Sequence, residues 1–411
     1  MVKKNNVPKI RFKDFTEEWE KRKYEDIGNC FQGGNLGYSD LDKEGKYKCI
    51  LYGDLYTRYD AIIENVKRRT NKKGNLVLKN DILFPQSTTV DAMSLISPAC
   101  MNDKKAYTSG VFIIRPHRNI IDGNFVSYYS KGNIEQRRKL SKNAQGLTIV
   151  HLYYNSIKNE KIMTPKYKEQ IRISECFKQL DNLITLHQRK YDKYKKIKNA
   201  LLEKMFPKKG SKIPEIRFKG FTDNWEQREL GEISDIVGGG TPNTNITDYW
   251  DGDINWYTPA EIGKQIYTSC SERKISKLGY KNSSAKMLPI NTILFTSRAG
   301  IGKTAILLTK ACTNQGFQSI IPDKNKLNYY FIFSRTNELK KYGETVGSGS
   351  TFVEVSKKQM ENMKLMIPTT ITEQKIIGQY FSNLDNLITL HQDICEKLKN
   401  IKKALLEKMF I

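Results

Sequence analysis

Several features are scarce in this sequence, and each absence argues against a class of protein. The 411 residues include only four histidines and seven cysteines, and the cysteines form no Cys-x-x-Cys pair. Neither a zinc knuckle nor a disulfide framework is therefore supported. No apolar run approaches the roughly 20 residues of a membrane-spanning helix, and the N-terminal segment lacks the apolar core of a signal peptide. We therefore expect a protein of the reducing cytoplasm.

Motifs of nucleotide-binding and nucleic-acid enzymes are incomplete. Residues 300–304 resemble a phosphate-binding loop, but the required first glycine falls at Ser297, and the segment lies between two strand-like runs. Asp323, with Glu338 and Lys340, has the outline of a metal-dependent nuclease, but Glu338 falls in an expected helix. So few histidines exclude most acid–base constellations. We therefore expect no catalytic residues and no metal site.

Positive charge, in contrast, is abundant. Lys and Arg number 69 against 44 Asp and Glu, which gives a formal net charge of +25. A folded protein with this excess attracts phosphate backbones or anionic membranes. Hydrophobic residues make up 38% of the chain, which is enough for globular domains with cores. Without a membrane-spanning segment, the charge favours nucleic acid as the partner.

The chain contains an internal duplication. The segment PKIRFKDFTEEWE at 8–20 returns as PEIRFKGFTDNWE at 214–226, and 180–206 and 384–410 are identical at 20 of 27 positions. Between these blocks the halves diverge, but short matches survive. These are 80–84 with 291–295, Ser109-Gly110 with Gln315-Gly316, 145–148 with 348–351, and Pro165 with Pro368. One unit was duplicated, and its middle was free to change.

Apolar residues at alternating steps of four and three predict a long helix at the end of each half. The residues expected to pair the helices are Phe177, Leu180, Ile184, His187, Tyr191 and Leu201, and Phe381, Leu384, Ile388, His391, Leu398 and Leu405. A helix over 169–206 would be about 57 Å long. We expect the two helices to pack on each other in antiparallel orientation, rather than each on its own domain alone. We interpret His187 and His391 as polar residues that set the register of the seam, and not as a catalytic pair.

The segments between the repeated blocks show short strand-like runs among Gly, Pro and Asn residues. We therefore predict an α+β fold with internal two-fold pseudo-symmetry, in which two α/β domains are separated by the pair of long antiparallel helices, a coiled coil. The expected boundaries are 1–165 and 214–368 for the two domains, and 166–213 and 369–411 for the helices with their linker.

Loops that combine Arg, Lys, amides, hydroxyls and aromatics are the candidates for DNA contact, because amides and Arg bond to base edges whereas Lys holds phosphates. In the first half the candidates are Gln32, Asn35, Arg58, Arg68, Arg69, Lys72, Gln86, Ser87, Thr88 and Gln145. In the second half they are Thr241, Trp256, Tyr257, Thr258, Arg298, Lys303, Gln315, Ser348 and Ser350.

The repeated blocks resemble the specificity subunit of type I restriction–modification enzymes over the whole chain. The resemblance rests on the two openings of the Pro-x-Ile-Arg-Phe type, on Glu169-Gln170 and Glu373-Gln374 before the seams, and on the closing Leu-Leu-Glu-Lys-Met-Phe. One loop departs from the pattern. Gln86-Ser-Thr-Thr89 stands where the second half has Ser297-Arg-Ala-Gly300, so a shared contact role for these two loops does not follow.

The resemblance implies a non-catalytic subunit with two target-recognition domains, each of which reads one half of a split site on double-stranded DNA. It implies that the helices act as a spacer and as the dock for two modification (methyltransferase) subunits, with restriction (translocase and endonuclease) subunits further out. S-adenosylmethionine, ATP and Mg²⁺ would belong to these partners in a bacterial cytoplasm, and this chain would need no cofactor. Because the two readers differ, we expect an asymmetric site. A helix of about 57 Å limits the distance between the centres of the two half-sites to about 17 base pairs, and a distance of about 10 base pairs is expected.

Two other functions remain open at this point. A stand-alone DNA-binding regulator with two readers would bind one bipartite site tightly without partners. An enzyme with an unrecognised active site would turn over nucleic acid as a purified chain.

Overall fold

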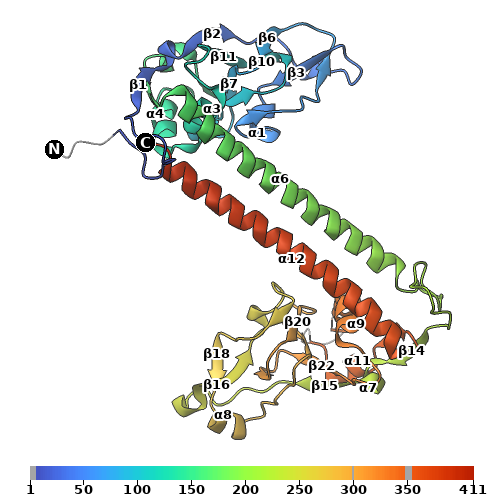
Figure 1. Ribbon diagram of the computed structural model, residues 1–411. Coiled ribbons are helices and arrows are strands. Elements are labelled where there is room, and N and C mark those ends of the chain that lie inside the picture. Colours follow the sequence, from blue (N-terminus) through green and yellow to red (C-terminus); the bar gives the residue numbers. More distant parts are fainter. Residues whose placement is uncertain (1–5, 299, 348–353) are drawn as a thin grey trace. The chain divides into compact units, whose positions relative to one another are not determined.

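The computed structural model describes residues 6–298, 300–347 and 354–411. The chain forms two compact units, of which unit 1 is Met1–Gln188 with Gln392–Ile411 and unit 2 is Arg189–His391. Each unit holds one α/β domain, one end of helix α6 (Tyr167–Lys204) and one end of helix α12 (Ile371–Lys408) (Figure 1). The unit boundaries therefore fall inside the two long helices.

The domain of unit 1 is built on a five-stranded and a four-stranded sheet. The first has the order β2 (Gly28–Gln32), β11 (Val111–Pro116), β7 (Ile82–Pro85), β9 (Ala99–Met101) and β4 (Ile62–Ile63). The second has the order β5 (Arg69–Thr70), β3 (Tyr47–Leu51), β10 (Lys105–Ser109) and β6 (Asn75–Leu78). Two strand pairs complete it, β1 (Glu20–Lys23) with β13 (Lys161–Thr164) and β8 (Ser87–Thr88) with β12 (Val150–His151). The helices are α1 (Asp54–Thr57), α2 (Ala92–Leu95), α3 (Gly123–Gly132), α4 (Ile134–Ser141) and α5 (Tyr154–Ile157).

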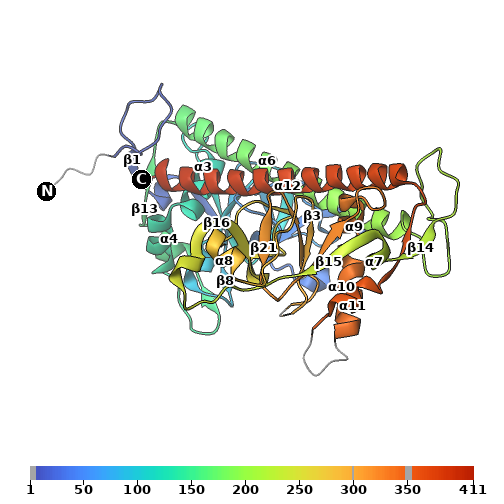
Figure 2. The same cartoon turned by 90° about the horizontal axis from the view of Figure 1, so that it is seen from below.

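The domain of unit 2 has a five-stranded and a three-stranded sheet. The first has the order β15 (Ser234–Gly238), β22 (Gln318–Pro322), β19 (Ile293–Phe295), β20 (Thr304–Leu307) and β17 (Tyr267–Thr268). The second has the order β18 (Arg273–Ile275), β16 (Trp250–Tyr257) and β21 (Ala311–Thr313), and β14 (Glu226–Glu229) pairs with β23 (Lys364–Ile367). The helices are α7 (Leu230–Ile233), α8 (Lys277–Lys281), which packs beside β16 (Figure 2), α9 (Tyr329–Ser334), α10 (Thr336–Gly347) and α11 (Lys357–Glu361).

The five-stranded sheets of the two domains share one topology although their sequences differ. In both five-stranded sheets the fourth and fifth strands are parallel and the first three are antiparallel to their neighbours. Asn80 and Asn291 both have a positive φ, 76° and 64°, and each precedes the central strand of its sheet. This left-handed conformation is one that asparagine tolerates better than most residues. The match between 80–84 and 291–295 in the sequence thus reflects one shared turn and strand.

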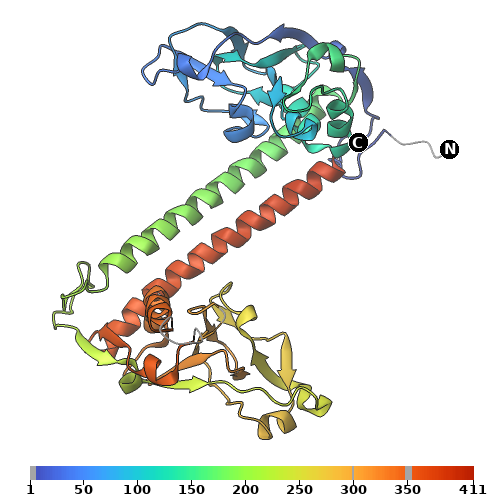
Figure 3. The same ribbon diagram turned by 180° about the vertical axis from the view of Figure 1, so that it is seen from behind.

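Within each unit α6 and α12 lie side by side (Figure 3). In unit 1 Cys395 Sγ of α12 lies 3.9 Å from the backbone oxygen of Ile184 of α6. In unit 2 the His391 ring of α12 stacks on Tyr194 of α6, with ring centroids 5.6 Å apart. Because the later α12 residue meets the earlier α6 residue, the helices are antiparallel. The predicted fold class, two α/β domains with a pair of long antiparallel helices, is confirmed.

The last turn of each long helix enters the core of the other repeat's domain. In unit 1 Phe410, after α12, packs against Phe125, Tyr129 and Phe177 with ring centroids 5.2–5.8 Å apart. In unit 2 Phe206, after α6, packs in the same way against Trp225, Phe331 and Phe381. Each domain is therefore anchored on the start of its own helix and closed by the end of the other helix.

The start of each long helix is fixed by a buried ion pair. Arg11 bonds both carboxylate oxygens of Glu169 at 2.7 Å, and Arg217 bonds Glu373 at 2.7 and 2.8 Å. Both glutamates are 1% exposed. Bidentate Arg–carboxylate pairs are among the strongest polar contacts in proteins. This explains why Ile-Arg-Phe and Glu-Gln occur in both halves of the sequence.

Two details differ from a simple reading of the sequence. The expected helix around Glu338 is α10, and a separate helix, α9, precedes it, since Arg335 lies between the two. Gly378 does not interrupt α12, although glycine weakens helices. A Cβ atom at Gly378 would lie 2.5 Å from Asn328 Oδ1, so the glycine allows the helix to approach the domain closely.

Candidate DNA interface

In each domain the candidate interface lies where the central strands of the five-stranded sheet end. Gln86 follows β7 and donates its backbone N–H to Gly110 at 3.0 Å. Ser297 follows β19 closely and donates in the same way to Gly316 at 2.8 Å. These contacts place Gln86 and Ser297 at equivalent positions of the shared topology. The loops that begin at Gln86 and Ser297 and depart from each other in sequence therefore start at the same place in the two domains.

The interface of unit 1, which we call the glutamine edge, consists of Gln32, Gln86, Gln145 and Tyr153. Gln86 Nε2 donates to Gln32 Oε1 at 2.9 Å. Gln32, Gln145 and Tyr153 line a cavity of about 360 Å³ together with Asn155. Gln32, Gln145 and Tyr153 are exposed, and Gln86 is half-buried. Amide side chains can offer a donor and an acceptor to one base edge, so this edge suits direct reading of DNA.

The interface of unit 2, which we call the threonine edge, consists of Thr241, Arg298 and Gln315. Thr241 Oγ1 donates to Gln315 Oε1 at 2.6 Å. Arg298 is half-exposed and its Nε lies 2.7 Å from Glu354 Oε1. Ser297 itself is fully buried. The two edges thus differ in their chemistry, with three glutamines in unit 1 against a hydroxyl, an amide and a guanidinium in unit 2.

Buried polar atoms without a partner lie close to the threonine edge in sequence. Among the described residues, the side-chain oxygens of Ser297, Gln318 and Ser319 are buried and accept or donate no hydrogen bond. An unsatisfied buried group costs about 1–3 kcal/mol. In native proteins such groups call for an explanation, such as a bound water molecule or local strain.

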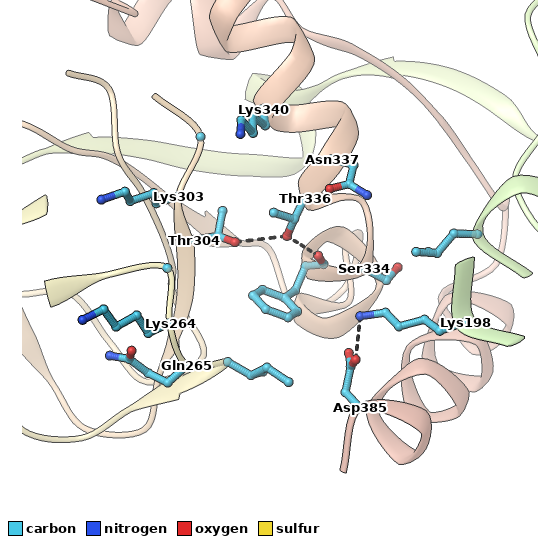
Figure 4. A pocket seen from close by; sticks show the side chains of 15 residues that line it. Lys198, Lys264, Gln265, Lys303, Thr304, Ser334, Thr336, Asn337, Lys340 and Asp385 are labelled. Carbon is cyan, nitrogen blue, oxygen red and sulfur yellow. Dashed lines mark hydrogen bonds and ion pairs between the residues drawn. The ribbon is translucent and has the colours of Figure 1, made fainter. Parts of the chain in front are cut away.

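Lysines also line a cavity in unit 2 that does not include the residues of the threonine edge. Lys264, Lys303 and Lys340 line a cavity of about 380 Å³ together with Thr304 and Thr336 (Figure 4). The cavity also contains the ion pair of Lys198 with Asp385, whose Nζ–Oδ1 distance is 2.5 Å. Lys264, Lys303 and Lys340 are exposed, so they suit contact with phosphates.

The basic candidates of the first half hold the domain together. Arg68 pairs with the buried Asp54 at 2.8 Å, and its guanidinium lies 5.2 Å from the Tyr38 ring. Arg69 donates to the backbone oxygen of Gly45 at 2.6 Å. Arg58 and Lys72 are more exposed but pair with Asp54 and Asp40, at 3.1 and 3.2 Å. Arg68 and Arg69 therefore contribute to the stability of the domain. The side chain of Asn35 is exposed and remains a candidate for DNA contact.

The aromatic candidates of the second half are also structural. Trp256 and Tyr257 are 4% and 1% exposed, and Trp256 Nε1 donates to the backbone oxygen of Gly240 at 2.8 Å. Thr258 bonds Glu261 Oε2 through both its backbone nitrogen, at 2.7 Å, and its hydroxyl, at 3.0 Å. Trp256 and Tyr257 are thus buried, and the hydrogen bonds of Trp256 and Thr258 are made within the domain.

The remaining candidates are distributed as follows. Ser87 and Thr88 form β8, in which Thr88 is buried and the backbone oxygen of Ser87 accepts from Tyr56 Oη at 3.0 Å. Ser348 and Ser350 lie outside the described residues. Residues 300–303 lie between the antiparallel strands β19 and β20, and Thr304 begins β20. Glu338 lies in α10 beside Arg335. Sequence reasoning missed Tyr153 and Asn155, whose only signal was a Tyr-Tyr-Asn-Ser run.

The residues expected to pair the helices line the inner face of α6 and α12. Phe177, Leu180 and Leu405 belong to the core of unit 1, and Leu201, Phe381 and Leu384 belong to the core of unit 2. Among the remaining residues of this set, His391 is buried. The others are half-buried, namely Ile184, His187, Tyr191, Ile388 and Leu398. His391 lies against an aromatic ring in the seam, as a residue of the helix interface does.

Two searches concern membranes and metals. Among the residues that the structure describes, no helix is long and apolar enough to span a lipid bilayer. Within 6–298, 300–347 and 354–411, no group of three or more His, Cys, Asp or Glu side chains could hold a metal ion.

Comparison with known families matches most of the chain to one family. The model of the type I restriction modification DNA specificity domain matches twice, at residues 16–196 and 222–400. The two matches coincide with the two halves of the duplication. They cover well over half of the chain.

Individual relatives carry the same description. The chain is 35% identical over 191 residues to the type I restriction enzyme MjaIX specificity subunit of Methanocaldococcus jannaschii, which covers 46% of this chain and 44% of that protein. It is 24% identical over 425 residues to the putative type I restriction enzyme MjaX specificity subunit of the same organism. This alignment covers 98% of this chain and 95% of that protein. The crystal structure of the S subunit of a type I restriction-modification system from M. genitalium matches with a TM-score of 0.66 at 16% identity, covering 98% of this chain and 99% of that chain. This last match concerns the fold alone.

Proposed function

Because the chain belongs to the family of type I restriction–modification DNA specificity subunits, we propose that its two domains read the two halves of one asymmetric, bipartite DNA site. The first domain reads its half through the glutamine edge, and the second reads its half through the threonine edge. The chain performs no catalysis itself.

One observation carries this proposal. Two domains of the same topology stand on the same buried contacts, yet their exposed strand ends carry different hydrogen-bonding groups. Direct reading of bases depends on the donor and acceptor pattern that the protein presents. Equal scaffolds with unequal edges therefore fit two half-sites of different sequence. The net charge of +25 supplies the attraction to the phosphate backbone.

We assign the spacing of the half-sites and the docking of partners to α6 and α12. A helix of 38 residues is about 57 Å long. Both helices carry large apolar residues that are 43–50% exposed, namely Leu183 and Leu186 on α6, and Leu390 and Ile401 on α12. Exposed apolar residues on a helix suit helices of a partner subunit. The proposed partners are two modification (methyltransferase) subunits and, beyond them, restriction subunits, all in the cytoplasm. S-adenosylmethionine, ATP and Mg²⁺ would bind to these partners.

The test is sequencing of methylated bases in the genome of the host strain, with and without this gene. The proposal predicts one bipartite motif that loses its methylation when the gene is deleted and regains it on complementation. Co-purification of the tagged chain should recover a methyltransferase. If every motif stays methylated after deletion, the proposal is wrong. Tight binding of one bipartite site by the chain alone, with all methylation unchanged, would indicate a stand-alone regulator instead.

A further inference from the structure

A short hairpin beside the glutamine edge presents an apolar tip to solvent. Gln145 and His151 exchange both backbone hydrogen bonds, at 2.9 and 2.7 Å, so residues 146–149 form a closed turn. Leu147 in this turn is 102% exposed, which means that no other residue covers any of its side chain. A fully exposed leucine forgoes the favourable free energy of burial that this side chain gains elsewhere.

The turn is tight, so Leu147 is held in place rather than trailing from a long loop. Gly146 has a φ of +111°, and a Cβ atom there would lie 2.1 Å from the backbone oxygen of Ile149. Only glycine fits this position. The hairpin is also tied to the glutamine edge, because Leu152 donates its backbone N–H to the backbone oxygen of Gln86 at 3.0 Å.

Two further apolar side chains lie at the same end of the hairpin. Ile149 is 48% exposed and Val90 is 71% exposed. Strand β12 pairs with β8 in antiparallel register, with Val150 opposite Thr88, so the chain beyond β8 continues toward the tip at Val90. Single exposed apolar residues are ordinary. Three at one end of a braced hairpin form a patch of the kind that marks an interaction site.

The surroundings of the patch favour DNA as its partner. Arg138, Lys139 and Lys142 are exposed in α4 and directly after it, immediately before the hairpin in sequence. Helix α2 packs against both α4 and β8, so the helix that carries these charges and the strand that pairs with the hairpin belong to the same part of the domain (α4 and β8 in Figure 2). Positive charges for phosphates, amides for base edges and a bare apolar tip occur together in proteins that insert a side chain between base pairs.

We propose that Leu147 is a wedge that enters the DNA groove at the half-site of the first domain and partly unstacks one base step. The inference rests on the proposed function, in that this domain must bind a half-site. It adds a residue that acts by deforming DNA, so the half-site would be selected for an easily unstacked step as well as by base contacts.

The experiment uses the full chain in complex with its co-expressed modification subunits and a duplex that carries the methylated motif. The fluorescent base 2-aminopurine replaces each purine of the first half-site in turn, and its emission rises where stacking is lost. Wild-type protein should raise the emission at one base step apart from the methylated base, which methyltransferases themselves extrude. Leu147→Ala should abolish this rise and weaken binding about tenfold or more, as expected for losing a buried leucine. Leu147→Phe should preserve the rise. Leu76→Ala removes a leucine in β6 that is 41% exposed, and it should behave as wild type.

The outcomes separate this inference from the proposed function. If Leu147→Ala binds the duplex and raises the emission as wild type does, Leu147 is not a wedge. If Leu147→Ala instead releases the modification subunits in size-exclusion chromatography, the tip is a protein contact and the inference is wrong. If no methylated motif depends on the gene at all, the proposed function fails first.

Discussion

The two units agree where each domain is anchored and differ at the candidate DNA interfaces. Tyr128 of unit 1 donates its hydroxyl to Asp181 at 2.7 Å, and Tyr330 of unit 2 donates to Asp385 at 2.9 Å. Each aspartate also pairs with a lysine of the opposite helix, Lys402 at 2.6 Å and Lys198 at 2.5 Å. The candidate interfaces show no such agreement. Gln86 hydrogen-bonds Gln32 in unit 1, whereas in unit 2 the equivalent Ser297 is buried and Thr241 hydrogen-bonds Gln315.

This difference teaches how one protein reads two sequences. The anchoring contacts are buried and depend on one another, so a change in one leaves a buried charge or hydroxyl unpaired. The interface residues are more exposed and attached to strand ends, where substitution costs little stability. The anchors are therefore constrained to stay alike, while the edges are free to diverge.

The largest expected effect comes from removing the aromatic residue that closes each domain. Phe410→Ala should destabilise unit 1 by roughly 3–5 kcal/mol, because a cavity opens in a filled core. Phe206→Ala should destabilise unit 2 by less, because Phe206 is half-buried against its core. Hydrogen–deuterium exchange should show faster exchange in α9 for Phe206→Ala and in α3 for Phe410→Ala. Leu183→Ala, at a residue 43% exposed on α6, is the control. Equal loosening of both units by either variant would contradict the reciprocal closure.

The next effect tests how far the two anchors are equivalent. Asp385→Asn removes the charge partner of Lys198 and should cost roughly 1.5–3 kcal/mol, as hydrogen bonds to charged groups do. Asp181→Asn should cost less, because the side chain of Asp181 is 28% exposed against 5% for Asp385, and because Lys402 keeps Asp60 as a partner. Denaturant unfolding followed by exchange in each unit measures both values. A larger loss of stability in Asp181→Asn than in Asp385→Asn would show that burial of the aspartate does not determine its contribution.

The interface residues should affect recognition and leave stability unchanged. Gln86→Ala should relax or change the base preference in one half of the methylated motif, and Gln315→Ala should do so in the other half. A lost bidentate amide contact lowers discrimination by about 1–3 kcal/mol per base. Sequencing of methylated bases in strains that carry each variant gives the result. If either variant changes both halves of the motif, the domains do not read independently.

The smallest effect concerns a carboxylate that joins the anchor network of unit 1. Burial alone would raise the pKa of Asp60, but Lys131 and Lys402 outweigh it and lower this pKa to about 2. Since the folded pKa lies below the unfolded value of about 3.9, the contribution to stability is present above pH 4 and is lost as the pH falls toward 2. The side chain is 56% exposed, so solvent screening limits the contribution to below about 1 kcal/mol. The stability difference between wild type and Asp60→Asn should vanish as the pH falls to 2, and a constant difference would rule out this role.

Much of the architecture could be predicted from the sequence, because it depends on periodicity and repetition. The seam positions and the match of 80–84 with 291–295 are local patterns that the structure reproduces as helices and equivalent strands. The entry of Phe206 and Phe410 into the domain cores was not predicted. A seam pattern shows which face of a helix is covered, but not which core its last turn completes.

The candidate interface was less predictable, because residue type does not reveal burial or partners. Arg68 has the chemistry of a DNA contact, but it pairs with Asp54, which no local pattern indicates. Trp256 and Tyr257 stand in a polar segment, and their burial follows only from the pairing of β16 with β18 and β21. The exposure of Leu147 depends on the turn at Gly146 and on the pairing of β12 with β8.

The most direct test of like anchors with unlike readers is to give one protein two copies of the same reader. Residues 20–164, from the start of β1 to the end of β13, are replaced by residues 226–367, from the start of β14 to the end of β23. Methylated bases are then sequenced in a strain that carries only this variant with the modification subunits. The account predicts a symmetric motif in which the half-site of the second domain occurs twice, as an inverted repeat. A motif that still contains the half-site of the first domain would contradict it.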